Sequence, residues 1–110
     1  MAVSEKYLMI VTTCPDEPAA EKVANALVAQ SLAACVQIIP GIKSVFRWQG
    51  EVENAAECLL LAKTVADNYP EIEKTINSIH DYEVPEIIAV PITTGSRDYL
   101  AWIDDNTKAL

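Results

Sequence analysis

The sequence has little of what several classes of protein need. Lys and Arg number 8 against 16 Asp and Glu, which leaves a net charge of −8. Nucleic-acid binding draws most of its affinity from cationic side chains on phosphates, and anionic membranes attract the same side chains. Three glycines and seven aromatic residues offer no G-x-G-x-x-G or P-loop and no stacking platform. We therefore expect no nucleic-acid partner and no membrane partner.

Cysteine is also scarce. Cys14, Cys35 and Cys58 are odd in number and lie in no CxxC motif, so the sequence indicates neither a disulfide framework nor a structural zinc site. Residues 1–6 show no basic region before an apolar run, so we expect no secretory signal. These observations predict a protein of the reducing cytoplasm.

The hydrophobic pattern predicts a single domain over residues 1–110. Residues 7–13 are expected to form a buried strand, followed by a helix that Asp16 caps. A strand over 34–39 ends at Pro40-Gly41, and 42–48 and 51–64 form a hairpin around Gln49-Gly50. A second helix opens at 67–70, a strand spans 86–92, and Gly95-Ser96 starts a tail helix. The order is that of an α+β, ferredoxin-like βαββαβ sandwich with a long hairpin and a C-terminal helix.

The predicted hairpin is too long for a domain of this size. A return arm over 51–64 would span ~48 Å when extended, whereas a compact chain of 110 residues is ~34 Å across. Either a bulge near 54–56 folds the arm back, or the arm pairs with another copy of the chain. We expect the second arrangement, and hence a homo-oligomer.

A few side chains carry chemistry. His80 follows a predicted helix and is either a partly exposed capping residue or a metal ligand. Cys14, in an expected loop before a helix, is either a packed thiol or a thiolate suited to metal. Cys35 and Cys58 are expected in the core. Lys63 ends an apolar strand and shares a strand face with Glu57, where it is either an ordinary strand-end lysine or part of a cleft.

Several motifs in this order closely resemble the CutA divalent-cation-tolerance family. They lie at 31–36, 44–50, 63–64, 80–87 and 95–102, and the likeness extends over residues 8–103. The resemblance implies a cytoplasmic homotrimer whose hairpins pair between subunits, a link to tolerance of copper and other divalent cations, and no enzymatic reaction.

The resemblance also implies site residues. His80 and Cys14 match proposed metal ligands, and Asp81, which stands where the family usually has proline, could add an oxygen ligand for Cu(II) or another divalent cation. A second group matches motif positions that would gather around a cleft between subunits: Lys63, Tyr82, Glu86, Trp48 and Glu57.

Two hypotheses follow. The first is a non-catalytic homotrimer that binds divalent metal ions, copper above all, through His80 and Cys14. The second is a regulatory module similar to the PII signal-transduction proteins, in which Lys63, Arg47 and Tyr82 hold a small anionic ligand or a partner protein in the inter-subunit cleft.

Overall fold

The structure is a computed structural model that describes residues 6–108. Most of the segment considered for a secretory signal, residues 1–5, lies outside the described residues. The elements are β1 (Tyr7–Cys14), α1 (Glu17–Ala29), β2 (Cys35–Trp48), β3 (Glu51–Val65), a 3₁₀ turn η1 (Ala66–Asn68), α2 (Tyr69–Ile79), β4 (Ile87–Pro91) and α3 (Arg97–Asp105). The predicted βαββαβ order with a tail helix is confirmed.

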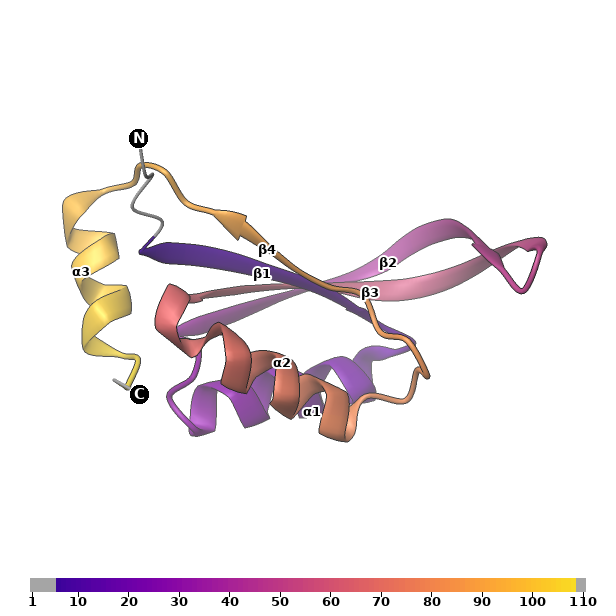
Figure 1. The fold of residues 1–110 in the computed structure, drawn as a ribbon, viewed down its shortest axis with the longest axis horizontal. Helices are drawn as coiled ribbons and strands as arrows, with labels where there is room; N and C mark the ends of the chain where they lie inside the picture. Colours follow the sequence, from indigo (N-terminus) through magenta and orange to yellow (C-terminus); the bar gives the residue numbers. More distant parts are fainter. Residues whose placement is uncertain (1–5, 109–110) are drawn as a thin grey trace.

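Within residues 6–108 the four strands form one antiparallel sheet in the order β2-β3-β1-β4. Helices α1 and α2 lie side by side on one face of this sheet, and α3 lies across its end (Figure 1). Pro91, which cannot donate to a ladder, is the last residue of the edge strand β4, as expected.

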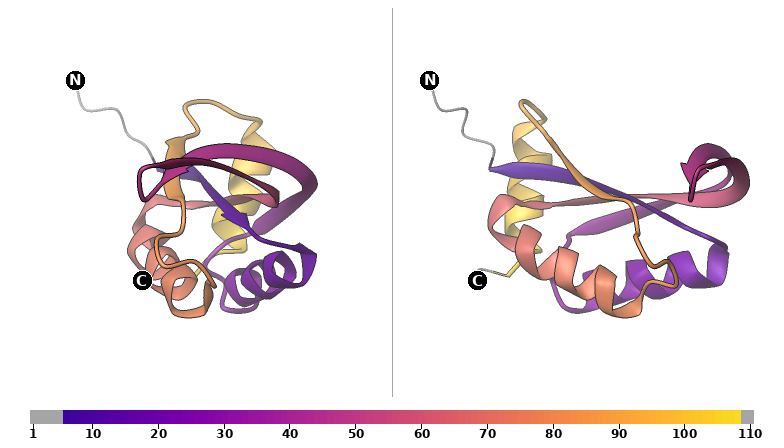
Figure 2. Two further views of the ribbon diagram at one scale, coloured as in Figure 1. Left: turned by 90° about the vertical axis from the view of Figure 1, so that its right-hand side faces the viewer. Right: turned by 45° about the vertical axis from the view of Figure 1, so that its right-hand side comes forward.

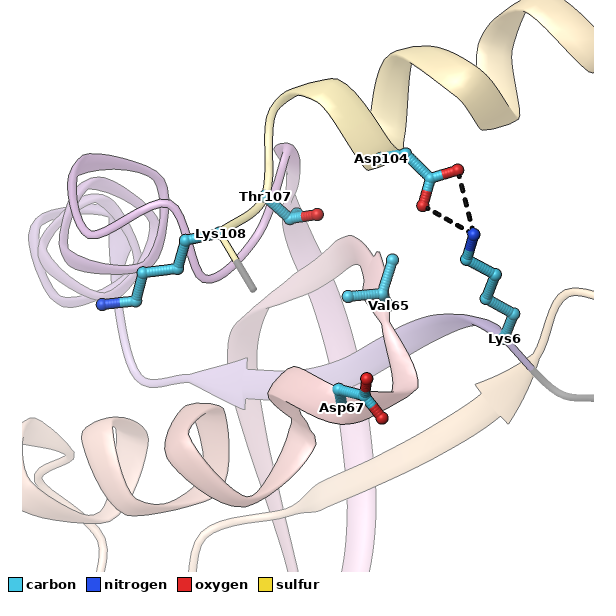
Figure 3. Close-up of a pocket in the computed structure, with 6 residues that line it drawn as sticks. All are labelled: Lys6, Val65, Asp67, Asp104, Thr107 and Lys108. Carbon is cyan, nitrogen blue, oxygen red and sulfur yellow. Dashed lines mark hydrogen bonds and ion pairs between the residues drawn. The ribbon is translucent and has the colours of Figure 1, made fainter. Parts of the chain in front are cut away.

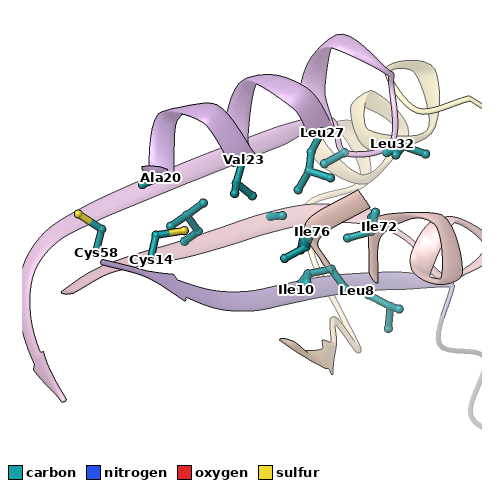
Figure 4. Packing of buried hydrophobic residues seen from close by; sticks show 13 residues of the cluster. Leu8, Ile10, Cys14, Ala20, Val23, Leu27, Leu32, Cys58, Ile72 and Ile76 are labelled. Carbon is teal, nitrogen blue, oxygen red and sulfur yellow. The ribbon is translucent and has the colours of Figure 1, made fainter. Parts of the chain in front are cut away.

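The core lies between the sheet and the two covering helices (Figure 4). Period-two alternation in β1 places Leu8, Ile10 and Thr12 on this side, and helical spacing places Ala20, Val23 and Leu27 opposite them. The predicted caps form: the Asp16 carboxylate accepts from the Ala19 N–H at 2.9 Å, and Ser96 accepts from the Tyr99 N–H at 3.3 Å.

The prediction that a strand ends at Pro40-Gly41 is wrong. β2 continues to Trp48, and the register with β3 shifts between Ile39 and Ile42. Gly41 has φ of +77°, a conformation in which a residue without Cβ is unstrained. The two residues therefore make a bulge, and the alternative considered from the sequence, a bulge at 54–56, is absent because Asn54, Ala55 and Ala56 are paired in register.

The hairpin projects beyond the two-helix layer and curls at its tip (Figures 1 and 2). Gln49 and Gly50 both have positive φ, 50° and 83°, as a two-residue turn with right-handed twist requires. The tip carries four large apolar side chains that are exposed: Val45, Phe46, Trp48 and Val52.

The opposite face of the sheet, called the open face below, is largely apolar, with Gln37 and Lys63 as polar members. Its large apolar residues alternate with those of the core along each strand and are half-buried or exposed: Met9, Val11, Ile39, Leu59, Leu61, Ile88 and Val90. Neither α1 nor α2 lies on this side (Figure 1). The chain therefore has one covered and one largely uncovered apolar sheet face.

Candidate functional site

A hollow of about 920 Å³ lies between the hairpin and the segment that joins α2 to β4. Phe46 and Trp48 supply an aromatic wall, and Pro85 and Val84 an apolar rim. Six of the nine residues expected at the site line this hollow, which are Arg47, Trp48, Glu57, Asp81, Tyr82 and Glu86.

Tyr82 and Glu57 meet inside the hollow. The Tyr82 hydroxyl donates to Glu57 Oε2 at 2.6 Å, and Glu57 is only 7% exposed. Burial, and then the adjacent carboxylate, raise the pKa of Tyr82 well above its usual range. The phenol thus stays protonated and fixes the loop after α2 to β3.

His80 is the C-terminal cap of α2, with its backbone N–H donating to the Ile76 carbonyl. Its Nε2 lies 2.6 Å from the Thr13 carbonyl oxygen, so this nitrogen carries the hydrogen and donates it. Its Nδ1 accepts from the Tyr82 N–H at 3.1 Å, and the two rings pack with centroids 4.8 Å apart. Both ring nitrogens are therefore engaged within the subunit.

Cys14 is the last residue of β1 and is buried, where a loop position was expected. Its Sγ lies 3.8 Å from His80 Nε2. Desolvation, with smaller effects from Cys58 and nearby carboxylates, raises the pKa of Cys14 to about 11. Of the two states that the sequence left open for Cys14, this conformation favours the packed thiol over the thiolate, because burial disfavours the charged form.

Lys63 does not line the hollow. Its Nζ donates to the side chain of Gln37 on the neighbouring strand β2. Lys63 lies six positions after Glu57 along extended β3, a distance of about 20 Å. Within one subunit these two members of the expected cleft therefore lie apart.

Arg47 is at the tip of the hairpin and donates to the Gly50 carbonyl at 3.1 Å. It is the one cation among the residues that line the hollow, against the carboxylates of Glu57, Asp81, Glu83 and Glu86. The electrostatic balance of this hollow thus favours cations over anions.

Two donors suited to a soft metal, Cys14 and His80, lie together, and Asp81 follows in sequence. Among residues 6–108, however, no group of three His, Cys, Asp or Glu side chains is placed to hold a metal ion. A bound ion would take its remaining ligands from water, from a rearranged Asp81 or from another subunit.

A second, smaller pocket of about 170 Å³ lies beside α3 (Figure 3). Asp104 accepts from the Tyr7 hydroxyl at 2.5 Å and pairs with Lys6 at 3.2 Å. This cluster was not predicted from the sequence, since Lys6 and Asp104 are 98 residues apart and belong to no motif. It joins the tail helix to the start of β1.

The Thr13 carbonyl was not predicted either, because a backbone acceptor leaves no residue-type signal.

No helix among residues 6–108 has the length and apolar character needed to cross a membrane.

The fold and the hollow define a small α+β domain of the ferredoxin-like type with a projecting hairpin. A family model described as CutA1 divalent ion tolerance protein matches residues 8–106, and the chain belongs to this family. The description of this family and the name of its Thermus thermophilus member mention no enzymatic activity.

Individual relatives cover most of the chain. The divalent-cation tolerance protein CutA of Thermus thermophilus is 46% identical over 90% of this chain and 96% of its own length. The chloroplastic protein CutA of Arabidopsis thaliana is 43% identical over 92% of this chain and 56% of its own. The solved Cut A1 structure from Thermus thermophilus has a TM-score of 0.91 at 45% identity, covering 93% and 99% of the two chains. CutA1 from Oryza sativa also has a TM-score of 0.91, at 36% identity over 97% and 98%. The predicted family and fold class are confirmed.

Proposed function

We propose that this chain is the subunit of a cytoplasmic, non-catalytic homotrimer that binds a divalent cation, with Cu(II) the preferred ion. The observation that carries the proposal is the 3.8 Å approach of Cys14 Sγ to His80 Nε2. Sulfur and nitrogen ligands on one tetrahedral ion lie about 3.5 Å apart, so the pair needs little movement to share a metal. Thiolate and imidazole together suit copper better than hard cations.

Binding would require two local changes. His80 would give up the hydrogen bond from Nε2 to the Thr13 carbonyl, and the Cys14 thiol would release its proton to become a ligand. Because the pKa of the Cys14 thiol is about 11, the metal ion has to displace its proton at neutral pH. The affinity for the metal ion should therefore rise with pH across the neutral range. Asp81 lines the hollow and is the oxygen ligand we expect to complete the set.

The proposed trimer is supported by the surfaces that one subunit leaves apolar. Ile88 on the open face is 51% exposed, and Val45 and Val52 at the hairpin tip are each 68% exposed. Burial of such surface against other copies would contribute about 25 cal/mol per Å². The cytoplasmic location is supported by three cysteines that are all free thiols, and cell fractionation tests it.

The experiment is a calorimetric titration of the purified protein with Cu(II), repeated with redox-inert Zn(II). His80→Ala and Cys14→Ser should each weaken binding by more than about tenfold. Cys58→Ser is the matched control, since it removes a second buried thiol, whereas the sulfur within hydrogen-bonding distance of His80 is that of Cys14. Equal affinity in the wild type and both ligand variants would remove this pair from the site.

A second candidate is a PII-like regulatory module, and the size of the hollow favours it. A volume of about 920 Å³ is within the range of small-molecule sites, and Arg47 beside Trp48 could bind an anionic, planar ligand. A thermal-shift screen of small anions tests this function. A ligand that stabilises the wild type but neither Arg47→Ala nor Lys63→Ala would support it, whereas stabilisation that survives both changes would exclude this cleft.

A further inference from the structure

Cys14 and Cys58 lie directly opposite each other on adjacent strands. The β1–β3 register pairs their Cα atoms, and residues paired in this way point to the same side of the sheet. Both side chains belong to the core beneath α1, at 1% and 4% exposure. Cys35 is paired with Lys63, near the other end of the sheet, so it is separated from this pair.

The spacing of the pair suits a disulfide. The Ala66 N–H donates to the Lys6 carbonyl at 2.7 Å, and these two residues come directly before and after the pair Tyr7 and Val65, so they extend the same register. Along an antiparallel ladder, hydrogen-bonded and non-hydrogen-bonded pairs alternate. Counting in twos from Lys6 and Ala66, the pair Cys14 and Cys58 is a hydrogen-bonded one. The Cα atoms of such a pair are about 5.5 Å apart. Disulfides span 4.4–6.8 Å between Cα atoms, roughly centred on this value.

In the structure the two thiols are not bonded to each other. Cys14 Sγ approaches His80 Nε2, and the sulfur of Cys58 points in a different direction (Figure 4). A bond between them needs rotation of both side chains about χ1, with the strands kept in register. Cys14 is the last residue of β1 and precedes Pro15, which has no N–H to contribute to the sheet, so this strand end can adjust.

We propose that Cys14 and Cys58 form a reversible cross-strand disulfide, which makes the pair a redox modification site of this protein. With a peroxide as oxidant, one thiol attacks the O–O bond to give a sulfenic acid and one water molecule. The second thiol then attacks that sulfur, the S–S bond forms, and a second water molecule leaves. Two thiols and one H₂O₂ thus yield one disulfide and two H₂O, and a dithiol reductant reverses the change.

The disulfide would alter the site beside it. Cys14 Sγ would turn from His80 toward β3 and would no longer be available as a thiolate ligand. If the proposed metal function holds, oxidation therefore removes the sulfur donor and weakens Cu(II) and Zn(II) binding. This consequence rests on the proposed function, whereas the disulfide itself does not.

The test uses the folded protein incubated with H₂O₂, followed by alkylation of free thiols and non-reducing tryptic mapping. Cleavage after Lys and Arg leaves the three cysteines on separate peptides, 7–22, 23–43 and 48–63. We expect most of peptide 7–22 to be linked to peptide 48–63 within one chain, with Cys35 still alkylated, and the same link in Cys35→Ser. A link through Cys35, a link between chains, or Cys14 and Cys58 still unlinked after overnight oxidation would overturn the proposal.

A second measurement separates the two proposals. Zn(II) titration of reduced and oxidised wild type should show at least tenfold weaker binding after oxidation, and reduction should restore it. If the link forms while reduced Cys14→Ser binds Zn(II) as the wild type does, the metal function fails and the disulfide stands. The disulfide-linked protein could instead bind Zn(II) as tightly as the reduced wild type while reduced Cys14→Ser binds it more weakly. That result would overturn the claim that the disulfide weakens metal binding.

Discussion

The side chain of His80 joins three segments of the chain. One ring nitrogen faces the Thr13 carbonyl at the end of β1, the other accepts from the backbone of Tyr82, and the residue caps α2. A histidine held in this way is already oriented before any ligand arrives, which lowers the cost of ordering a site. The same contacts make His80 important for the fold, so its variants need a folding control.

The bond between Tyr82 and Glu57 gives a direct test of the hollow. Tyr82→Phe leaves a buried carboxylate without its partner and should lower the free energy of unfolding by about 1–3 kcal/mol. Urea unfolding at matched protein concentration measures the change. Glu57→Gln keeps an acceptor for the hydroxyl and should cost less; a Tyr82→Phe protein as stable as the wild type would contradict this geometry.

The Asp104 cluster predicts a pH dependence. The hydrogen bond from Tyr7, and the interaction with Lys6, lower the pKa of Asp104 below its usual range. A depressed carboxyl pKa adds stability above the unfolded value of about 3.9, and this contribution is lost as the pH falls through the folded value. Asp104→Asn should therefore have a lower Tm at pH 7, and the difference should vanish in strong acid. A difference that grows as the pH falls would contradict the assignment.

At the level of single residues, part of the site could be predicted from the sequence. The motif around Tyr82 and the alternation of β3 brought Tyr82, Glu57 and Glu86 to one hollow. The sequence left the state of Cys14 open between a packed thiol and a thiolate, because burial depends on how α1 closes over the strand end. Lys63 was grouped with Glu57 by their shared face, which says nothing about the distance along a strand.

Among the elements, α1 ends in an unusual way. The Leu32 N–H donates to the Leu27 carbonyl and the Ser31 N–H to that of Val28, which is a Schellman motif with Ser31 at the position that usually holds glycine. Ser31 has φ of +57°, where an L-residue with a Cβ is strained.

Ser31→Gly should accordingly raise the free energy of unfolding by about 0.5–1 kcal/mol, since glycine removes the strain at a modest entropic cost in the unfolded chain. Denaturant unfolding measures this gain. Ser31→Ala keeps the Cβ and is the matched control, expected to give no gain. Destabilisation by glycine would show that the serine side chain has a role of its own.

The elements themselves could largely be predicted from the sequence, since caps at Asp16 and Ser96 and the turn at Gln49-Gly50 are local signals. The continuation of β2 through Pro40-Gly41 could not. A proline followed by glycine stops a strand in most settings, and only pairing with β3 on both sides of the bulge keeps this one continuous.

Over the whole molecule, the open face and the hairpin tip leave large apolar side chains exposed, and apolar side chains gathered on a surface mark sites of interaction with other chains. The length of the predicted strands already indicated this need for a partner. The structure has no bulge at 54–56, the alternative to pairing, and instead has one at Pro40-Gly41 and a curled tip. In the proposed trimer, neighbouring copies cover these surfaces and the hollow becomes a cleft between subunits.

A charge on the open face should weaken that assembly. Ile88→Lys places an ammonium group in a surface that the trimer would bury, so the variant should dissociate at protein concentrations where the wild type does not. Sedimentation velocity over a dilution series measures this. Val28→Lys, at a 45% exposed position on α1, is the matched control and should leave the assembly intact.

The mass of the native particle tests the account most directly. Light scattering on the peak eluted from a size-exclusion column, at micromolar concentration, should give a mass three times the 12.0 kDa of the chain. The buffer is reducing and contains no added metal. A particle of 12.0 kDa that keeps its native circular dichroism would contradict the account, because a subunit that is stable alone would have no need of partners for its open face or its hairpin.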